Sequence, residues 1–212
     1  MSVLPAGIAA ATGQTATAPR LREARVQATT LIAIGGGEVV LELTVGANGG
    51  VTGIKQIRAT PPYTDLVSDA AATWQFEAAT MTVEGRTVPI AATVLVAAVF
   101  RPPSIYAGPA AGTPPQTTGV SSPRLPRVES MVMPAYPATS VGDAVVLIEI
   151  EMTRSAQPVG YRLLGPASGF DDAALDAVRG WRFTAPRDPD VPEPLFVYAI
   201  AGFRTPIAAR SR

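Results

Sequence analysis

The chain has 212 residues, of which 47% are hydrophobic and 16% are charged, a balance that favours packed cores over disorder. Its 17 basic and 17 acidic residues cancel, so we expect no basic field able to bind nucleic acid. The absence of cysteine and histidine excludes disulfides, thiolate metal sites and histidine-activated nucleophiles, and we expect no cofactor.

The N-terminal segment, residues 1–34, is expected to be partly disordered or to lead into the first domain. Val3–Ala11 ends in small residues like the tail of a signal peptide but lacks a basic start and a full apolar stretch. Two interpretations stay open, a trimmed export signal or anchor and a frayed terminus. The longest apolar runs, among them Ile90–Phe100, are too short to span a membrane, which takes about 20 residues.

A repeat with an offset of 107 positions organises the rest of the chain. The segment from Asp65 to Phe76 aligns without a gap on the segment from Asp172 to Phe183. The only two tryptophans, Trp74 and Trp181, fall on each other in this alignment. A fixed offset is the signature of a repeated unit, and this one is too long for a solenoid. We therefore expect two duplicated small domains.

Each copy begins with two expected strands. At 39–45 and again at 146–152, every second residue is apolar and two of the three residues between them are polar or acidic, which is typical of a half-buried antiparallel strand. A second strand is expected at about 51–58 and 158–164. Asn48-Gly49-Gly50 provides the turn between the strands of the first copy.

The period then becomes helical, with apolar residues at i, i+4, i+7, i+8 and i+11. These residues are Tyr63, Val67, Ala70, Ala71 and Trp74 in the first copy, and Phe170, Ala174, Ala177, Val178 and Trp181 in the second. The stripe predicts an amphipathic helix of three turns, with each tryptophan buried on the sheet of its own domain. The nearby cluster Asp171, Asp172 and Asp176 is interpreted as helix capping and solvation rather than a metal or acid–base site.

A last strand closes each copy, and a hairpin at 83–87 precedes it in the first. The expected class is therefore α+β, with two small strand-strand-helix-strand domains, each an antiparallel sheet with a helix packed on one face. The domains span 35–101 and 131–204. Residues 102–130 form a proline-rich linker, and residues 205–212 form a C-terminal tail. The linker suits an extended spacer, although a packed surface loop or an SH3-type ligand is also open.

The second copy resembles the C-terminal domain of the TonB energy-transducer family and, more distantly, the TolA domain. Tyr136-Pro137, the strand Val145–Ile150 and the helix within 170–183 carry the likeness. In the first copy, Trp74-x-Phe76 and the hairpin Glu84–Pro89 carry it. The first copy departs from the family in lacking the Tyr-Pro pair and in having Ala72 where the helix arginine would stand.

The resemblance implies binding rather than catalysis. Members of this family are periplasmic proteins of Gram-negative envelopes, associated with TonB-dependent transmembrane transport, that pair an edge strand with a peptide of an outer-membrane transporter. A full transducer also has an N-terminal membrane helix, which we do not find in this sequence. We therefore do not expect energy transduction by this chain unless an anchor precedes it.

The resemblance and the rules of strand pairing both indicate the last strand of the second domain as the docking edge. The expected partner-binding residues are Leu195, Phe196, Val197, Tyr198, Ala199, Ile200 and Ala201, and the second choice is the strand with Thr93, Leu95 and Ala97. The competing interpretation is that this strand is covered within the chain or by a second copy, so a homo-oligomer is left open.

Two further classes of function stay open. One is a structural envelope protein whose domains pair with each other or with another chain. The other is an enzyme based on a carboxylate or on Lys55, the only lysine. A free strand edge would support binding, a buried edge would support the structural class, and a pocket with converging carboxylates would support the enzyme.

Overall fold

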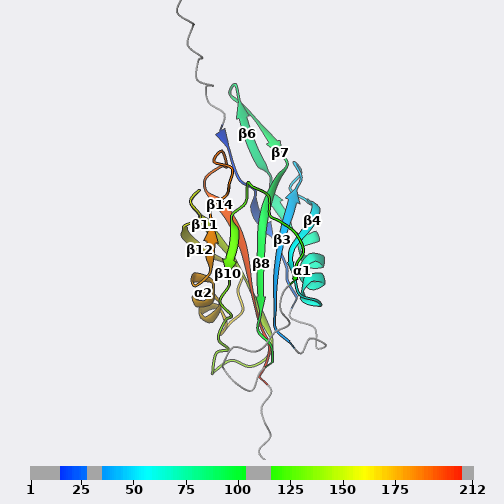
Figure 1. Ribbon diagram of the computed structural model, residues 1–212, viewed down its shortest axis with the longest axis vertical. Helices are drawn as coiled ribbons and strands as arrows, with labels where there is room; N and C mark the ends of the chain where they lie inside the picture. The colour runs from blue at the N-terminus through cyan, green and yellow to red at the C-terminus, as the bar shows by residue number, and fades with distance from the viewer. Residues whose placement is uncertain (1–14, 28–34, 104–115, 207–212) are drawn as a thin grey trace, which may run out of the picture.

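The computed structural model describes residues 15–27, 35–103 and 116–206 (Figure 1). The signal-like segment Val3–Ala11 lies outside these residues, as do residues 104–115 of the proline-rich stretch. Within the described ranges, no helix combines the length and the apolar character needed to cross a membrane.

Both repeats fold into two antiparallel strands, a helix and a last strand. In the first repeat these are β3 (Gly37–Val45), β4 (Val51–Ala59), α1 (Tyr63–Ala72) and β8 (Ala92–Phe100). In the second repeat they are β11 (Ala144–Met152), β12 (Pro158–Gly165), α2 (Asp171–Arg179) and β14 (Leu195–Phe203). The strands pair antiparallel within each repeat, and one helix packs on each, so the predicted α+β class is confirmed.

Short strands fill the connection between helix and last strand. The first repeat has β5 (Gln75–Glu77), β6 (Ala79–Val83) and β7 (Arg86–Ile90), and the second has only β13 (Arg182–Thr184). The predicted hairpin is confirmed between β6 and β7, where Glu84 and Gly85 take positive φ angles of 51° and 76°. This hairpin projects beyond the end of the main sheet (Figure 1).

The two repeats share one seven-stranded sheet, in the order β12-β11-β14-β8-β3-β4-β9. The strand β9 (Gln116–Thr117) comes from the stretch between the repeats. The last strands, β8 and β14, pair in parallel at the centre, with Ala199 opposite Ala97. The repeats are therefore joined by a backbone ladder and not only by a spacer.

The two helices lie on opposite faces of this sheet, which we call the α1 face and the α2 face (Figure 1). The equivalent strands of the two repeats run outward in opposite directions from the parallel pair β14–β8. The repeats are therefore related by a rotation about the strand direction, which exchanges the two faces of the sheet. On the α1 face, Trp74 and Val67 share a core with Tyr198 and Ile200 of the second repeat. On the α2 face, residues of the first repeat join the core of the second in the same way.

Each helix covers only part of its face of the sheet. A short strand that precedes each repeat in the chain covers the rest of that face. These strands, the straps, are β2 (Arg20–Glu23) and β10 (Arg127–Ser130). Strap β2 pairs with β5, and strap β10 pairs with β13. Each strap therefore lies on the same face of the sheet as the helix of its own repeat, and it packs against the strands of the other repeat. A further short strand, β1 (Thr15–Ala16), pairs with β6.

Both tryptophans are buried, as predicted, with exposed fractions of 0% for Trp74 and 2% for Trp181. Their indole N–H groups donate to the backbone carbonyls of Arg25 and Val132, at 3.3 and 3.1 Å. The cores differ from the prediction in one respect, because Trp74 also contacts the ring of Tyr198 across the repeat boundary, with centroids 6.4 Å apart. Neither domain has a core made of its own residues alone.

Candidate functional site

The strand predicted to dock a partner, Leu195–Ala201, lies in the interior of the sheet. It belongs to β14, which pairs with β11 on one side and with β8 on the other. Its residues are buried except Phe196, which is half-buried. The expectation of a free edge here is wrong, because the backbone groups on both sides of β14 are already paired, on one side with β11 and on the other with β8. The second choice, around Leu95 and Ala97 on β8, is interior for the same reason.

One free edge of the sheet is β12. This strand pairs with β11, and no described strand pairs with its outer side. Such an edge presents a row of backbone N–H and C=O groups. Val159 is 62% exposed, while Tyr161, Leu163 and Leu164 are half-buried. The edge therefore combines backbone groups with apolar side chains.

The opposite edge, on β4, is covered by the chain itself. There β9 pairs antiparallel with Arg58 and Ala59. The N–H of Thr118 then donates to the carbonyl of Ile57 at 3.0 Å. The two repeats thus differ at equivalent edges, with an extended segment on the first and an open outer side on the second.

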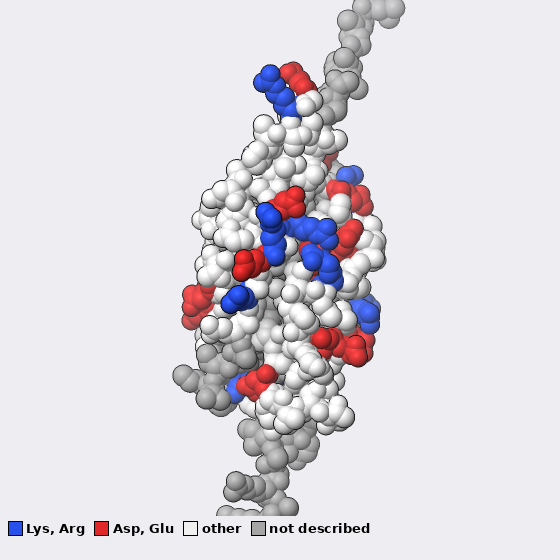
Figure 2. All heavy atoms as spheres, turned by 180° about the vertical axis from the view of Figure 1, so that it is seen from behind, with Lys and Arg blue, Asp and Glu red and all other residues white. Residues whose placement is uncertain are grey.

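A charged cluster lies on the α1 face beside the open edge. Glu149 is only 2% exposed and accepts from Arg20 of strap β2 and from Arg162 of β12, with N···O distances of 3.0 and 2.9 Å. Figure 2 shows basic and acidic side chains gathered midway along the face seen from behind. The hydrogen bond to Glu149 raises the pKa of Arg20, which keeps the guanidinium charged.

The buried phenol of Tyr198 lies next to this cluster. Its hydroxyl accepts the N–H of Leu21 at 2.8 Å, which ties strap β2 to β14. Burial raises the pKa of Tyr198 well above its ordinary value, and the nearby carboxylate of Glu149 adds to the shift. The cluster is therefore a fixed structural clamp, and the phenol stays neutral.

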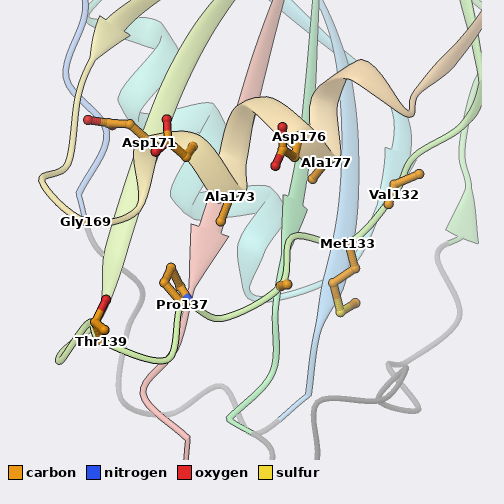
Figure 3. A pocket seen from close by; sticks show the side chains of 11 residues that line it. Val132, Met133, Pro137, Thr139, Gly169, Asp171, Ala173, Asp176 and Ala177 are labelled. Atoms are coloured by element: carbon orange, nitrogen blue, oxygen red, sulfur yellow. The ribbon is translucent and has the colours of Figure 1, made fainter.

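The predicted acidic cluster lines an open groove of about 740 Å³ under α2 (Figure 3). Asp171 accepts the N–H of Ala167 at 2.8 Å, and Asp176 pairs with Arg179 at 3.1 Å. The interpretation of helix capping is wrong, because Asp171 binds an N–H that precedes the helix and α2 has no side-chain cap. The interpretation of solvation fits Asp176, whose side chain is 76% exposed. Among the described residues, no group of three or more acidic side chains is placed to hold a metal ion. Val132 and Met133, from the segment after β10, form the other wall of the groove.

A second hollow, of about 500 Å³, lies between the repeats near the starts of β8 and β14. Its lining is mostly apolar and includes Met81, Ile90, Leu125 and Phe196.

Lys55, the candidate for lysine-based catalysis, is not among the residues that line this hollow. It is exposed, and its ammonium group donates to the backbone carbonyl of Val120 at 2.8 Å.

The straps and the open β12 edge were missed by sequence reasoning. A signal for the straps was present, since Pro19-Arg20 recurs at the same offset as Pro126-Arg127. The β12 edge had no such signal, because its exposure depends on how the two repeats join. No protein-family model, curated protein or solved structure matches the chain.

Proposed function

We propose that this protein is a periplasmic, TonB-like protein-binding module without catalytic activity, associated with TonB-dependent transport. It would bind an extended segment of an envelope or outer-membrane partner by adding it as a strand. The observation that supports this is the outer side of β12, which no described strand covers. Strand addition at such an edge supplies affinity through main-chain hydrogen bonds.

The proposal moves the docking edge from β14 to β12. The original choice rested on the unpaired backbone of the last strand, and that backbone is used inside the chain by β8. β12 keeps the required properties, with half-buried apolar side chains and few obstacles to pairing. Its charged residue, Arg162, is bound to Glu149. Lysines and outward charges are the usual protection of an edge strand, and β12 has no lysine.

A binding experiment with proline variants tests this function. Leu164 and Val159 are the two extra residues at the bulges of the β11–β12 ladder, so neither is opposite a residue of β11. We expect Leu164→Pro or Val159→Pro to reduce retention of a specific envelope protein by the immobilised chain. The matched control is Thr52→Pro, at the equivalent bulge of β4. Equal retention by all variants would contradict binding at β12.

A second candidate is a structural envelope protein whose two domains pair with each other. The parallel ladder between β8 and β14 supports it, because it buries the edge that the family resemblance would leave for a partner. This candidate predicts no envelope protein whose retention depends on β12. The enzyme alternative has less support, since Lys55 donates to a backbone carbonyl and the three aspartates line an open groove.

A further inference from the structure

The segment that covers β4 shows how an extended chain binds the outer strand of a repeat, and we use it as a template for the equivalent strand β12. After β9, Thr118 and Gly119 both direct their N–H groups at the carbonyl of Ile57, at 3.0 and 3.4 Å. The hydroxyl of Thr118 also donates to the carbonyl of Gln56 at 3.1 Å. All three hydrogen bonds therefore end on two backbone carbonyls and do not depend on the side chains of β4.

Residue 119 lies so close to β4 that there is no space for a side chain. A Cβ atom at this position would lie 2.8 Å from the carbonyl oxygen of Gln56, closer than real Cβ contacts. The segment reaches the edge this closely only because residue 119 is glycine. The hydroxyl residue and the glycine after it thus form one recognition unit, Thr118-Gly119.

The same backbone features recur on β12. The β3–β4 ladder has an extra residue at Ile57, and the β11–β12 ladder has one at Leu164, which is 107 positions later. Gln56 corresponds in the same way to Leu163. The equivalent of Ala59 is Pro166, which has no N–H, so pairing at that end is weaker than on β4. The transferable contacts are those of the Thr-Gly pair.

We propose that β12 recognises an antiparallel, extended protein segment that contains a Thr-Gly or Ser-Gly pair. The two N–H groups of the pair would bind the carbonyl of Leu164, and the hydroxyl would bind the carbonyl of Leu163. This inference rests on the proposed function and adds the sequence class and direction of the partner segment. The occupant is a segment of another protein, for which the template of the first repeat supplies the chemistry.

The test uses a blocked synthetic peptide with the sequence of residues 115–120, titrated into the full chain and followed by backbone amide NMR shifts. We expect saturable shifts concentrated at Leu163–Gly165. A peptide carrying Gly119→Ala should bind about ten-fold more weakly, as should one carrying Thr118→Val, which corresponds to roughly one hydrogen bond or one close contact. In the protein, Val159→Pro should leave peptide binding unchanged, because Val159 lies five residues before Leu164 and a six-residue peptide centred on the Thr-Gly pair does not reach it.

Three results would overturn the inference. The first is equal binding of the parent and Gly119→Ala peptides, which needs no variant of the protein and so does not depend on its folding. The second is a set of shifts confined to β4, which would mean that the peptide only replaces the chain's own segment. The third is concentration-dependent shifts at β12 without peptide, which would identify a second copy as the occupant. If the peptide fails while a β12-dependent envelope partner is found, the proposed function stands and the Thr-Gly inference falls.

Discussion

The two repeats satisfy a buried carboxylate in different ways. Glu42 and Glu149 occupy equivalent places on the first strand of each repeat, and each is close to the strap region of the other repeat. Glu149 is bound by two arginines, whereas Glu42, 9% exposed, accepts the backbone N–H of Ser122 at 2.8 Å. A buried charge is costly unless it is paired and hydrogen-bonded, and the fold accepts both solutions.

The difference bears on the edges of the sheet. Arg162 and Lys55 are equivalent residues, each directly opposite its glutamate on the neighbouring strand. Arg162 is held by Glu149, while Lys55 reaches the carbonyl of Val120 and so helps to hold the chain's own segment on β4. The first repeat therefore has lysine at this position and a covered edge, whereas the second repeat has arginine there and an open edge.

The largest effect is expected from removing either tryptophan. Because Trp74 and Trp181 are buried in cores that contain residues of both repeats, Trp→Ala at either position should cost about 3–5 kcal/mol. Urea unfolding followed by circular dichroism should show one cooperative transition that shifts to lower urea in both variants. Two separate transitions, with only one of them moved, would mean that the repeats fold independently.

A proline in the central strand should be the next most damaging change. Ala199 is fully buried and lies between Ile148 and Ala97 in the ladder, so Ala199→Pro removes a paired N–H inside the sheet and should cost roughly 3 kcal/mol or more. Val159→Pro, at the exposed bulge of β12, is the matched control and should cost less than about 1 kcal/mol. Equal loss in both variants, measured by urea unfolding, would contradict the central placement of β14.

The arginine and the lysine at the equivalent positions should differ in importance. Arg162→Ala leaves the buried Glu149 with Arg20 as its remaining cation, and should cost about 1–3 kcal/mol. Lys55→Ala removes an exposed contact to a carbonyl and should cost less than about 0.5 kcal/mol. Urea midpoints of the two variants give this comparison, and a larger loss for Lys55→Ala would reverse our account of the two carboxylates.

Local elements were predictable from the sequence because short-range patterns determine them. The helix stripe ending at Trp181, the hairpin at Glu84-Gly85 and the second strand of each repeat all lie close to their expected positions. In each case the evidence was a period or a turn residue within about twelve positions. The observed helices are shorter than the predicted stripe. α1 ends at Ala72, and Trp74 follows the helix after a turn.

The joining of the repeats could not be predicted in the same way. A strand such as β14, apolar on both faces, indicates that both faces are covered, but not whether its free side meets a partner, a second copy or β8. The clamp of Arg20 on Glu149 joins residues 129 positions apart, and only the parallel ladder places them together. The open edge of β12 follows from that same ladder, so it too was absent from any local pattern.

The last predicted effect concerns a position of the last strand at which the second repeat has a tyrosine and the first does not. Tyr198 is the fourth residue of β14, and the fourth residue of β8 is Leu95, which does not titrate. Burial raises the pKa of Tyr198 in the folded state, whereas an unfolded tyrosine ionises near pH 10. The folded state therefore holds this proton more tightly, so the stabilisation is present below about pH 10 and is lost as the pH rises further.

Tyr198→Phe should lose about 1 kcal/mol at neutral pH, because the N–H of Leu21 loses its acceptor, but its stability should fall less steeply above pH 10. Urea unfolding of parent and variant between pH 8 and pH 11 measures this difference, and because Tyr63 and Tyr161 are present in both proteins, their contributions cancel. If the free energy of unfolding of both proteins falls with the same slope over that range, the phenol ionises in the folded protein as easily as in the unfolded one. Strap β2 would then not shield the hydroxyl of Tyr198 from water.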